Sequence, residues 1–124
     1  MRLFTTRLFD KWAAKEGVTD AVLRVAVAEM AQGLVEADLG GHVYKKRVGL
    51  PGRGKRGGAR TLLAFRIGDR AVFLYGYAKN ERDNIDAQEL KALKRLAAEV
   101  LGWTVVQLDV ALAQGKLIEV ANDG

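Results

Sequence analysis

Basic side chains are concentrated in one stretch of this 124-residue sequence, between Val43 and Arg66. The stretch contains eight lysines and arginines and no aspartate or glutamate, so it carries a charge of +8. The whole chain has a net charge of +5, which leaves −3 for the remainder. Positive charge focused in this way favours a polyanion such as nucleic acid as the ligand. Closely spaced cations can also lower the pKa of a lysine and stabilise the charge of a pentavalent phosphate.

A glycine-rich loop is expected inside the basic stretch, from Gly49 to Gly58. Its sequence matches the nucleotide-binding motifs G-x-x-x-x-G-K and G-x-G-x-x-G. However, Arg56 replaces the Ser or Thr that would hold magnesium, and a strand is expected to follow instead of a helix. Without a helix N-terminus the phosphate cradle lacks its dipole and amide donors. We instead expect either a solvated loop or one that follows a phosphate backbone, with Arg53, Lys55 and Arg56 supplying the charge.

Most other kinds of catalytic centre are excluded by composition. The chain has no cysteine, and His42 is its only histidine. Metal clusters of histidine and cysteine and a Ser-His-Asp triad are therefore not expected. Neither a metal nor a cofactor is predicted. The carboxylates of Glu81, Asp83 and Asp86 are interpreted as helix caps and ion pairs beside Lys79 and Arg82.

Three strands are expected to position the basic side chains, namely residues 43–48, 61–67 and 71–77. Gly68-Asp69 between the last two is a hairpin signal. Side chains alternate across a strand, so Lys45 and Arg47 share one face and Lys46 takes the other. By the same rule Arg60 shares a face with Leu62, Ala64 and Arg66, while Thr61, Leu63 and Phe65 are expected to face the core.

The basic face is completed by the third strand, on which Tyr75, Tyr77 and Lys79 share a side. If Lys45, Arg47, Arg60 and Lys79 converge, the sheet presents a cationic patch with tyrosines beside it. The alternative is basic residues scattered over the surface. Trp12, Trp103 and Phe9 are interpreted as core residues rather than base-stacking ones.

Four helices are predicted from apolar periodicity and capping signals: residues 7–16, 19–34, 86–102 and 104–115. Thr5 or Thr6 is expected to cap the first, and Gly17 to end it. Capping boxes are expected at Asp86 with Glu89 and at Thr104 with Gln107. Short strands are expected at residues 2–5 and 117–120. The order predicts a single α+β domain over residues 1–124, with helices packed on a small antiparallel sheet.

The bulk properties favour a globular protein of the cytoplasm. The hydrophobic fraction of 49% argues against disorder. The lack of cysteine fits a reducing compartment. No apolar run approaches the roughly 20 residues of a membrane span, and the N-terminus has no signal-peptide core. No association with a membrane is therefore expected.

Three short sequence segments together match the pattern of a known family: residues 44–47 (YKKR), 58–62 (GARTL) and 78–82 (AKNER). With the PGRGKRGG segment they resemble the RelE/HigB-type toxins of bacterial type II toxin–antitoxin pairs, and the HigB-like branch most closely. The resemblance extends from Phe9 to about Val120. It implies a RelE-like fold and a metal-independent mRNA interferase that enters the ribosomal A site, where the RNA 2′-OH attacks the adjacent phosphate. It also implies a co-encoded antitoxin, often a helix-turn-helix protein.

The resemblance also implies roles for single residues. Lys45 and Arg47 fall where the family has strand lysines acting on the 2′-OH and the phosphate, and Arg60 falls at a phosphate-binding arginine. Asn80 stands where RelE proper has a catalytic arginine, so Lys79 or Arg82 would substitute for it. Asp86 stands near the place of a C-terminal tyrosine, so Tyr75 or Tyr77 would have to stack on a base.

The predicted catalytic set is therefore Lys45, Arg47, Arg60 and Lys79, without an assigned general acid or base. The predicted RNA-binding set is Lys46, Arg53, Lys55, Arg56, Arg66, Tyr75, Tyr77 and Arg82. The predicted partners are the ribosome, mRNA and the antitoxin. Two alternatives remain open: a nucleic-acid-binding domain without catalysis, and a toxin of the ParE type that acts on DNA gyrase.

Overall fold

The computed structural model describes residues 1–52 and 54–121, and for residues 54–57 it describes the backbone alone. Its elements form an α+β fold, as predicted from the sequence. In chain order they are β1 (Arg2–Thr6), α1 (Arg7–Glu16), α2 (Asp20–Ala31), β2 (Ala37–Asp38), β3 (Val43–Leu50), β4 (Gly54–Arg66), β5 (Arg70–Ala78), α3 (Ala87–Gly102), α4 (Val105–Ala113) and β6 (Leu117–Val120).

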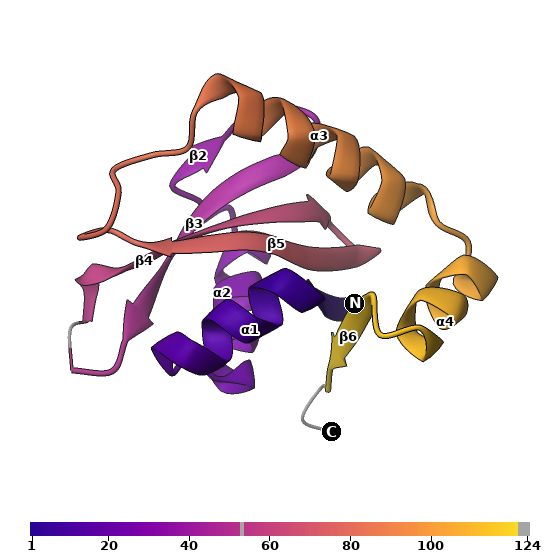
Figure 1. The fold of residues 1–124 in the computed structure, drawn as a ribbon, viewed down its shortest axis with the longest axis horizontal. Helices are drawn as coiled ribbons and strands as arrows, with labels where there is room; N and C mark the ends of the chain where they lie inside the picture. Colours follow the sequence, from indigo (N-terminus) through magenta and orange to yellow (C-terminus); the bar gives the residue numbers. More distant parts are fainter. Residues whose placement is uncertain (53, 122–124) are drawn as a thin grey trace.

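The described strands form one six-stranded sheet in the order β2-β3-β4-β5-β1-β6. All neighbours are antiparallel except β1 and β5, which run parallel. The helices α1 and α2 separate β1 from the strands that follow, which allows β1 to return beside β5. The basic strands β3 and β4 thus lie in one half of the sheet, with the short strand β2 at their outer edge (Figure 1).

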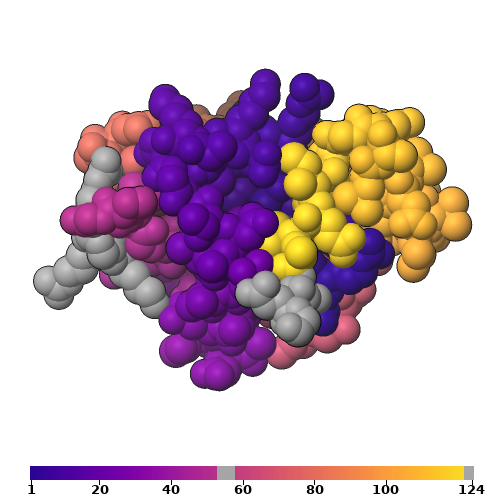
Figure 2. All heavy atoms as spheres, turned by 90° about the horizontal axis from the view of Figure 1, so that it is seen from below, coloured from indigo at the N-terminus to yellow at the C-terminus, as the bar shows by residue number. Residues whose placement is uncertain are grey.

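Helices cover both faces of the sheet. α3 crosses one face, and α1 with α2 covers the other (Figure 1); Figure 2 looks onto the α1 and α2 side. The predicted core side of Thr61, Leu63 and Phe65 is confirmed, but the opposite side of β4 also faces a core, which the sequence did not predict. Leu62 and Ala64 on the opposite side are fully buried as well, because they pack under α3.

The helix boundaries follow the predicted capping residues. Thr6 caps α1, Thr19 caps α2, and capping boxes begin α3 at Asp86 and α4 at Thr104. Gly17 ends α1 in the left-handed conformation that glycine adopts at low cost. The second helix ends at Ala31, three residues before its predicted end at Leu34.

The predicted ten-residue loop between the basic strands is wrong, because most of it belongs to strands. β3 extends to Leu50, which pairs with Gly54 at the start of β4. The turn is therefore short, and Gly52 within it has a φ of 76°, which favours glycine. Both nucleotide-binding patterns fall on this β-hairpin, and no helix follows it.

A β-bulge directs the tyrosines of β5. Leu62 pairs with Tyr75 while Leu63 pairs with Phe73, so Leu74 is the extra residue. Leu74 and Tyr75 consequently both pack on the α3 side, whereas Phe73 lies in the opposite core. The predicted shared face of the two tyrosines is confirmed, because the bulge precedes both of them.

No single helix among the described residues is long and apolar enough to cross a membrane. By length and composition only, the pair α3 and α4, bent by 114°, could do so.

Candidate functional site

Two arginines on neighbouring strands share one carboxylate. Arg47 of β3 and Arg60 of β4 are directly opposed in the antiparallel ladder, so their side chains leave the same face. Nε of Arg47 lies 3.1 Å from the carboxylate of Glu36, and Nε of Arg60 lies 2.9 Å from it. The amide of Glu36 donates a hydrogen bond of 2.9 Å to the carbonyl of Lys45. The chain entering β2 is thereby fixed beside β3, which holds the carboxylate between the two guanidinium groups.

Arg60 is almost enclosed, yet one of its nitrogens has no partner. The residue is 6% exposed. Its Nη1 is buried and makes no hydrogen bond within the described part of the chain. Leaving a buried donor unsatisfied costs about 1–3 kcal/mol. The guanidinium is therefore anchored through Nε, and Nη1 is a donor without a described partner.

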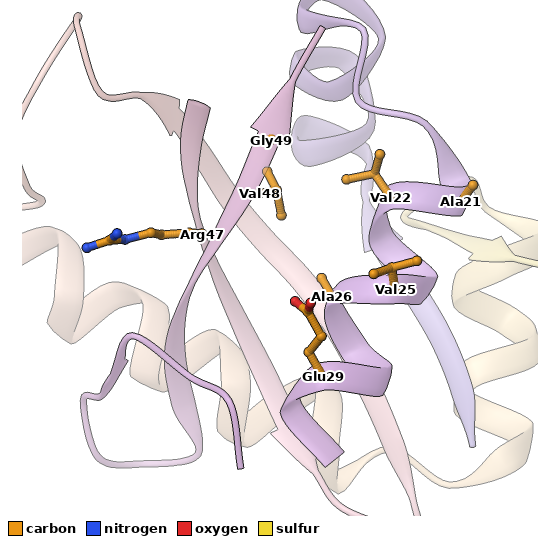
Figure 3. Close-up of a pocket in the computed structure, with 8 residues that line it drawn as sticks. All are labelled: Ala21, Val22, Val25, Ala26, Glu29, Arg47, Val48 and Gly49. Carbon is orange, nitrogen blue, oxygen red and sulfur yellow. The ribbon is translucent and has the colours of Figure 1, made fainter. Parts of the chain in front are cut away.

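Arg47 extends from the sheet on the side opposite to α2. In Figure 3 its side chain leaves β3 away from Val22 and Ala26, whereas the next residue, Val48, points toward them. Its side chain is 46% exposed, so it is accessible to a ligand. Lys45, two positions earlier, lies on the same face by strand alternation and forms no ion pair with the described side chains.

Tyr77 of β5 is directly opposed to Arg60 on the other side of β4. It is 2% exposed, and its hydroxyl donates a hydrogen bond of 3.4 Å to the carbonyl of Asp83. The guanidinium of Arg82 lies 5.6 Å from its ring centroid. Burial raises the pKa of Tyr77, and the negative charge of Glu36 acts in the same direction. A ring so buried offers little surface to a base, so the predicted stacking role of Tyr77 gains no support.

Arg82 is held by the first turn of α3. Its two terminal nitrogens donate to the carboxylate of Glu89 at 2.9 and 2.5 Å, and one lies 3.4 Å from the hydroxyl of Tyr75. The bonds between Arg82 and Glu89 raise the pKa of the arginine and lower the pKa of the carboxyl to about 2. The Tyr75 and Tyr77 rings lie beside this pair, with centroids 6.3 Å apart. Arg82 thus anchors the segment after β5 to α3.

Comparison with known proteins gives the family of the chain. The family model described as the RelE toxin of the RelE / RelB toxin–antitoxin system matches residues 1–120. The chain belongs to the RelE toxin family. A search of curated proteins found no match. The match confirms a RelE-type toxin that pairs with an antitoxin, while the HigB-like branch stays a prediction.

Two residues predicted to bind RNA have structural partners in this RelE toxin. Nζ of Lys46 lies 2.8 Å from Glu29 of α2, on the face opposite to Arg60. Arg66 donates a 3.1 Å hydrogen bond to the carbonyl of Leu101 near the end of α3, and pairs with Asp69 at 3.0 Å. The structure does not bring either residue together with Arg60, and their RNA-binding roles stay predictions.

Of the remaining predicted residues, the structure describes the side chain of Lys79 alone. Lys79 follows β5 and is exposed, and its amide donates to the carbonyl of Gly58. Arg53 lies outside the described residues, as do the side chains of Lys55 and Arg56. Over residues 1–52 and 54–121, no three His, Asp or Glu side chains are grouped so that they could hold a metal ion.

Glu36 is the member of the site that sequence reasoning missed. It lies outside the acid-free stretch and next to a two-residue strand, so composition separates it from the arginines. A signal was present in Gly40-Gly41, a turn pair just before β3. Had residues 36–38 been predicted to pair back onto β3, Glu36 would have been placed beside Arg47.

Proposed function

We propose that this RelE-family toxin is a ribosome-dependent mRNA endoribonuclease of the HigB-like branch that inhibits translation in the cytoplasm. In the reaction, the 2′-OH of one nucleotide attacks the adjacent phosphorus and displaces the 5′-oxygen of the next. The products are a 2′,3′-cyclic phosphate and a 5′-hydroxyl end. The chain's own side chains stabilise the additional charge on the phosphate, without a metal or other cofactor.

The observation that carries this proposal is the unpartnered, buried Nη1 of Arg60 beside the exposed guanidinium of Arg47. A non-bridging phosphate oxygen bound at Nη1 would satisfy a donor that is unsatisfied in the free protein. Guanidinium groups suit this task because their planar forks match the geometry of phosphate oxygens. Lys45 on the same face adds an ammonium group that has no described carboxylate partner.

Glu36 acts as a positioning residue in this proposal. Its carboxylate accepts hydrogen bonds from Nε of both arginines, which fixes the direction in which their outer nitrogens point. The fixed orientation reduces the reorganisation needed when charge develops on the phosphate.

The partner of the toxin in this proposal is a co-encoded helix-turn-helix antitoxin. Antitoxin pairing is a property of the family, while the helix-turn-helix class is our expectation. Co-expression with the neighbouring open reading frame is expected to restore the growth of cells that the toxin arrests.

The test of the function is cleavage of mRNA on purified ribosomes. The wild-type protein is added to ribosomes programmed with a defined mRNA, and new 5′ ends are mapped by primer extension. We expect cuts within the A-site codon, 5′-hydroxyl ends, and no cleavage of the same RNA without ribosomes. Arrest of growth with intact mRNA and inhibited DNA gyrase would instead assign the protein to the gyrase-directed toxins. RNA binding without cleavage or growth arrest would indicate a binding domain.

A further inference from the structure

A cleft of about 180 Å³ lies on the opposite side of β5 from β4, between α1 and the segment that follows β5. Leu8 and Trp12 of α1 line it on one side, and Glu81 and Arg82 on the other, with Gly76 between them. None of these residues belongs to the arginine pair described above. The cleft is therefore separate from the arginine pair.

The cleft exists because β5 is longer than its neighbour β1. β1 pairs with residues 70–73 only, and beyond them α1 takes the place of a strand along this edge. The hydroxyl of Thr6 satisfies one free acceptor there, through a 3.2 Å hydrogen bond to the carbonyl of Leu74. Trp12 lies so close to the strand that a Cβ on Gly76 would be 2.4 Å from its ring. The glycine thus lets an indole lie directly against the backbone.

The cleft adjoins the proposed phosphate site. Tyr77 lines the cleft, and it is directly opposed to Arg60 across the β4–β5 ladder. Neighbouring strands are about 4.8 Å apart. The cleft thus lies one strand away from Arg60, at the edge of β5, and its occupant in this arrangement is a base of a neighbouring nucleotide in the same RNA strand.

The chemistry of the lining suits a base and not a phosphate. Trp12, predicted as a core residue, is only partly buried and lines the cleft, so it supplies aromatic surface on which bases stack favourably. Glu81 is exposed, and its carboxylate has no hydrogen bond or ion pair with the described residues, so it is available as an acceptor. Its neighbour Arg82 does not neutralise it, because both terminal nitrogens are bound to Glu89. A free carboxylate repels phosphate and accepts N–H groups from the Watson–Crick edge of a base.

We propose that this cleft is a base-recognition subsite that selects guanine in the RNA strand, a reading that rests on the proposed function. Trp12 stacks on the base and Glu81 accepts from its edge. Guanine fits best because its N1–H and N2–H donors are adjacent and match the two oxygens of a carboxylate. The other bases present one such donor or a donor beside an acceptor.

Cleavage specificity gives the first test. Wild-type protein, Glu81→Gln and Asp83→Asn are compared on ribosomes programmed with messages that differ only in the A-site codon. Asp83→Asn is the matched control, since it removes the same charge from the same segment. We expect wild type and the control to prefer guanine-containing codons, and Glu81→Gln to lose about tenfold of that preference. An unchanged preference in Glu81→Gln would overturn the proposal.

A binding measurement makes the test independent of catalysis. Trp103→Phe leaves Trp12 as the only tryptophan, so fluorescence reports on the cleft. The probes are 2′-O-methyl trinucleotides, which cannot be cleaved, with guanosine, inosine or uridine at the central position. We expect the strongest quenching with guanosine and a weaker effect with inosine, which lacks the 2-amino group. Guanosine-selective quenching by a protein that cleaves no mRNA would support the subsite and refute the proposed function. Cleavage of mRNA together with equal quenching by all three probes would support the proposed function and refute the subsite.

Discussion

Replacing Arg60 with alanine separates a catalytic role from a structural one. Arg60 is 6% exposed, its Nε donates to the carboxylate of Glu36 at 2.9 Å, and its Nη1 has no described partner. If Nη1 serves the phosphate, its loss removes a contact that strengthens in the transition state. If Arg60 only supports the fold, its loss affects stability and not rate.

The two effects differ enough in size to be distinguished. Removing one partner of a buried ion pair usually costs about 3–5 kcal/mol, because the other charge is left unpaired. In Arg60→Ala, Glu36 keeps its ion pair with Arg47, and its side chain is 21% exposed. The unsatisfied donor Nη1 is removed together with the Arg60 side chain. We therefore expect a cost of about 1 kcal/mol, which lowers Tm by roughly 4 °C in a chain of this length. Loss of one transition-state donor instead slows the chemical step about 100- to 1000-fold.

The assay is single-turnover cleavage of mRNA on programmed ribosomes, with thermal unfolding measured on the same preparations. Arg60→Lys should recover only part of the rate, because the charge remains but the two-pronged donor does not. Arg95→Ala, on the exposed side of α3, is a control for the loss of one positive charge. A near wild-type cleavage rate in Arg60→Ala together with a lower Tm would show that the site assignment is wrong.

Three further substitutions test other parts of the site. Glu36→Gln should slow cleavage at least about tenfold while RNA binds more tightly at low salt, because both arginines lose their internal counterion; filter binding and single-turnover rates measure this. Gly76→Ala should cost about 1–3 kcal/mol in chemical denaturation, since a Cβ would lie 2.4 Å from the Trp12 ring. Glu89 has a pKa of about 2 against an ordinary value of 4.5, so its stabilising effect is fully present above about pH 4.5 and is lost as the pH falls toward 2. Denaturation between pH 2 and 6 should therefore show a weaker decline for Glu89→Gln than for wild type, and parallel curves would contradict the pairing with Arg82.

The sequence was sufficient for most elements because each carried a local signal. The threonine caps and Gly17 act within one helical turn, and Gly68-Asp69 joins two apolar runs. The failures involve longer-range geometry. The glycines after Gly49 favour a turn locally, but pairing between β3 and β4 extends both strands through them. The parallel position of β1 beside β5 depends on packing of α1, which no local pattern encodes.

The sequence predicted the basic residues of the site but not its acidic residue. Strand alternation placed Arg47 and Lys46 on opposite faces, as the structure has them, and left open whether Arg47 and Arg60 converge, which the pairing of β3 with β4 brings about. Alternation cannot say which charges find partners, so it grouped Arg66 with Arg60. Arg66 instead reaches the end of α3, where helix carbonyls lack internal donors. Glu36 was missed for the same reason, since its role depends on a tertiary contact.

The arrangement explains how so positive a segment can fold without a bound polyanion. Arg47 and Arg60 are directly opposed, so their side chains leave the same face of the sheet and their positive charges repel each other. One carboxylate between them offsets that repulsion without occupying Nη1 of Arg60. On the opposite face Lys46 is neutralised by Glu29. The described cations of this stretch are thus divided between the two sides of the sheet, and those that we propose to bind a phosphate share a face with Glu36.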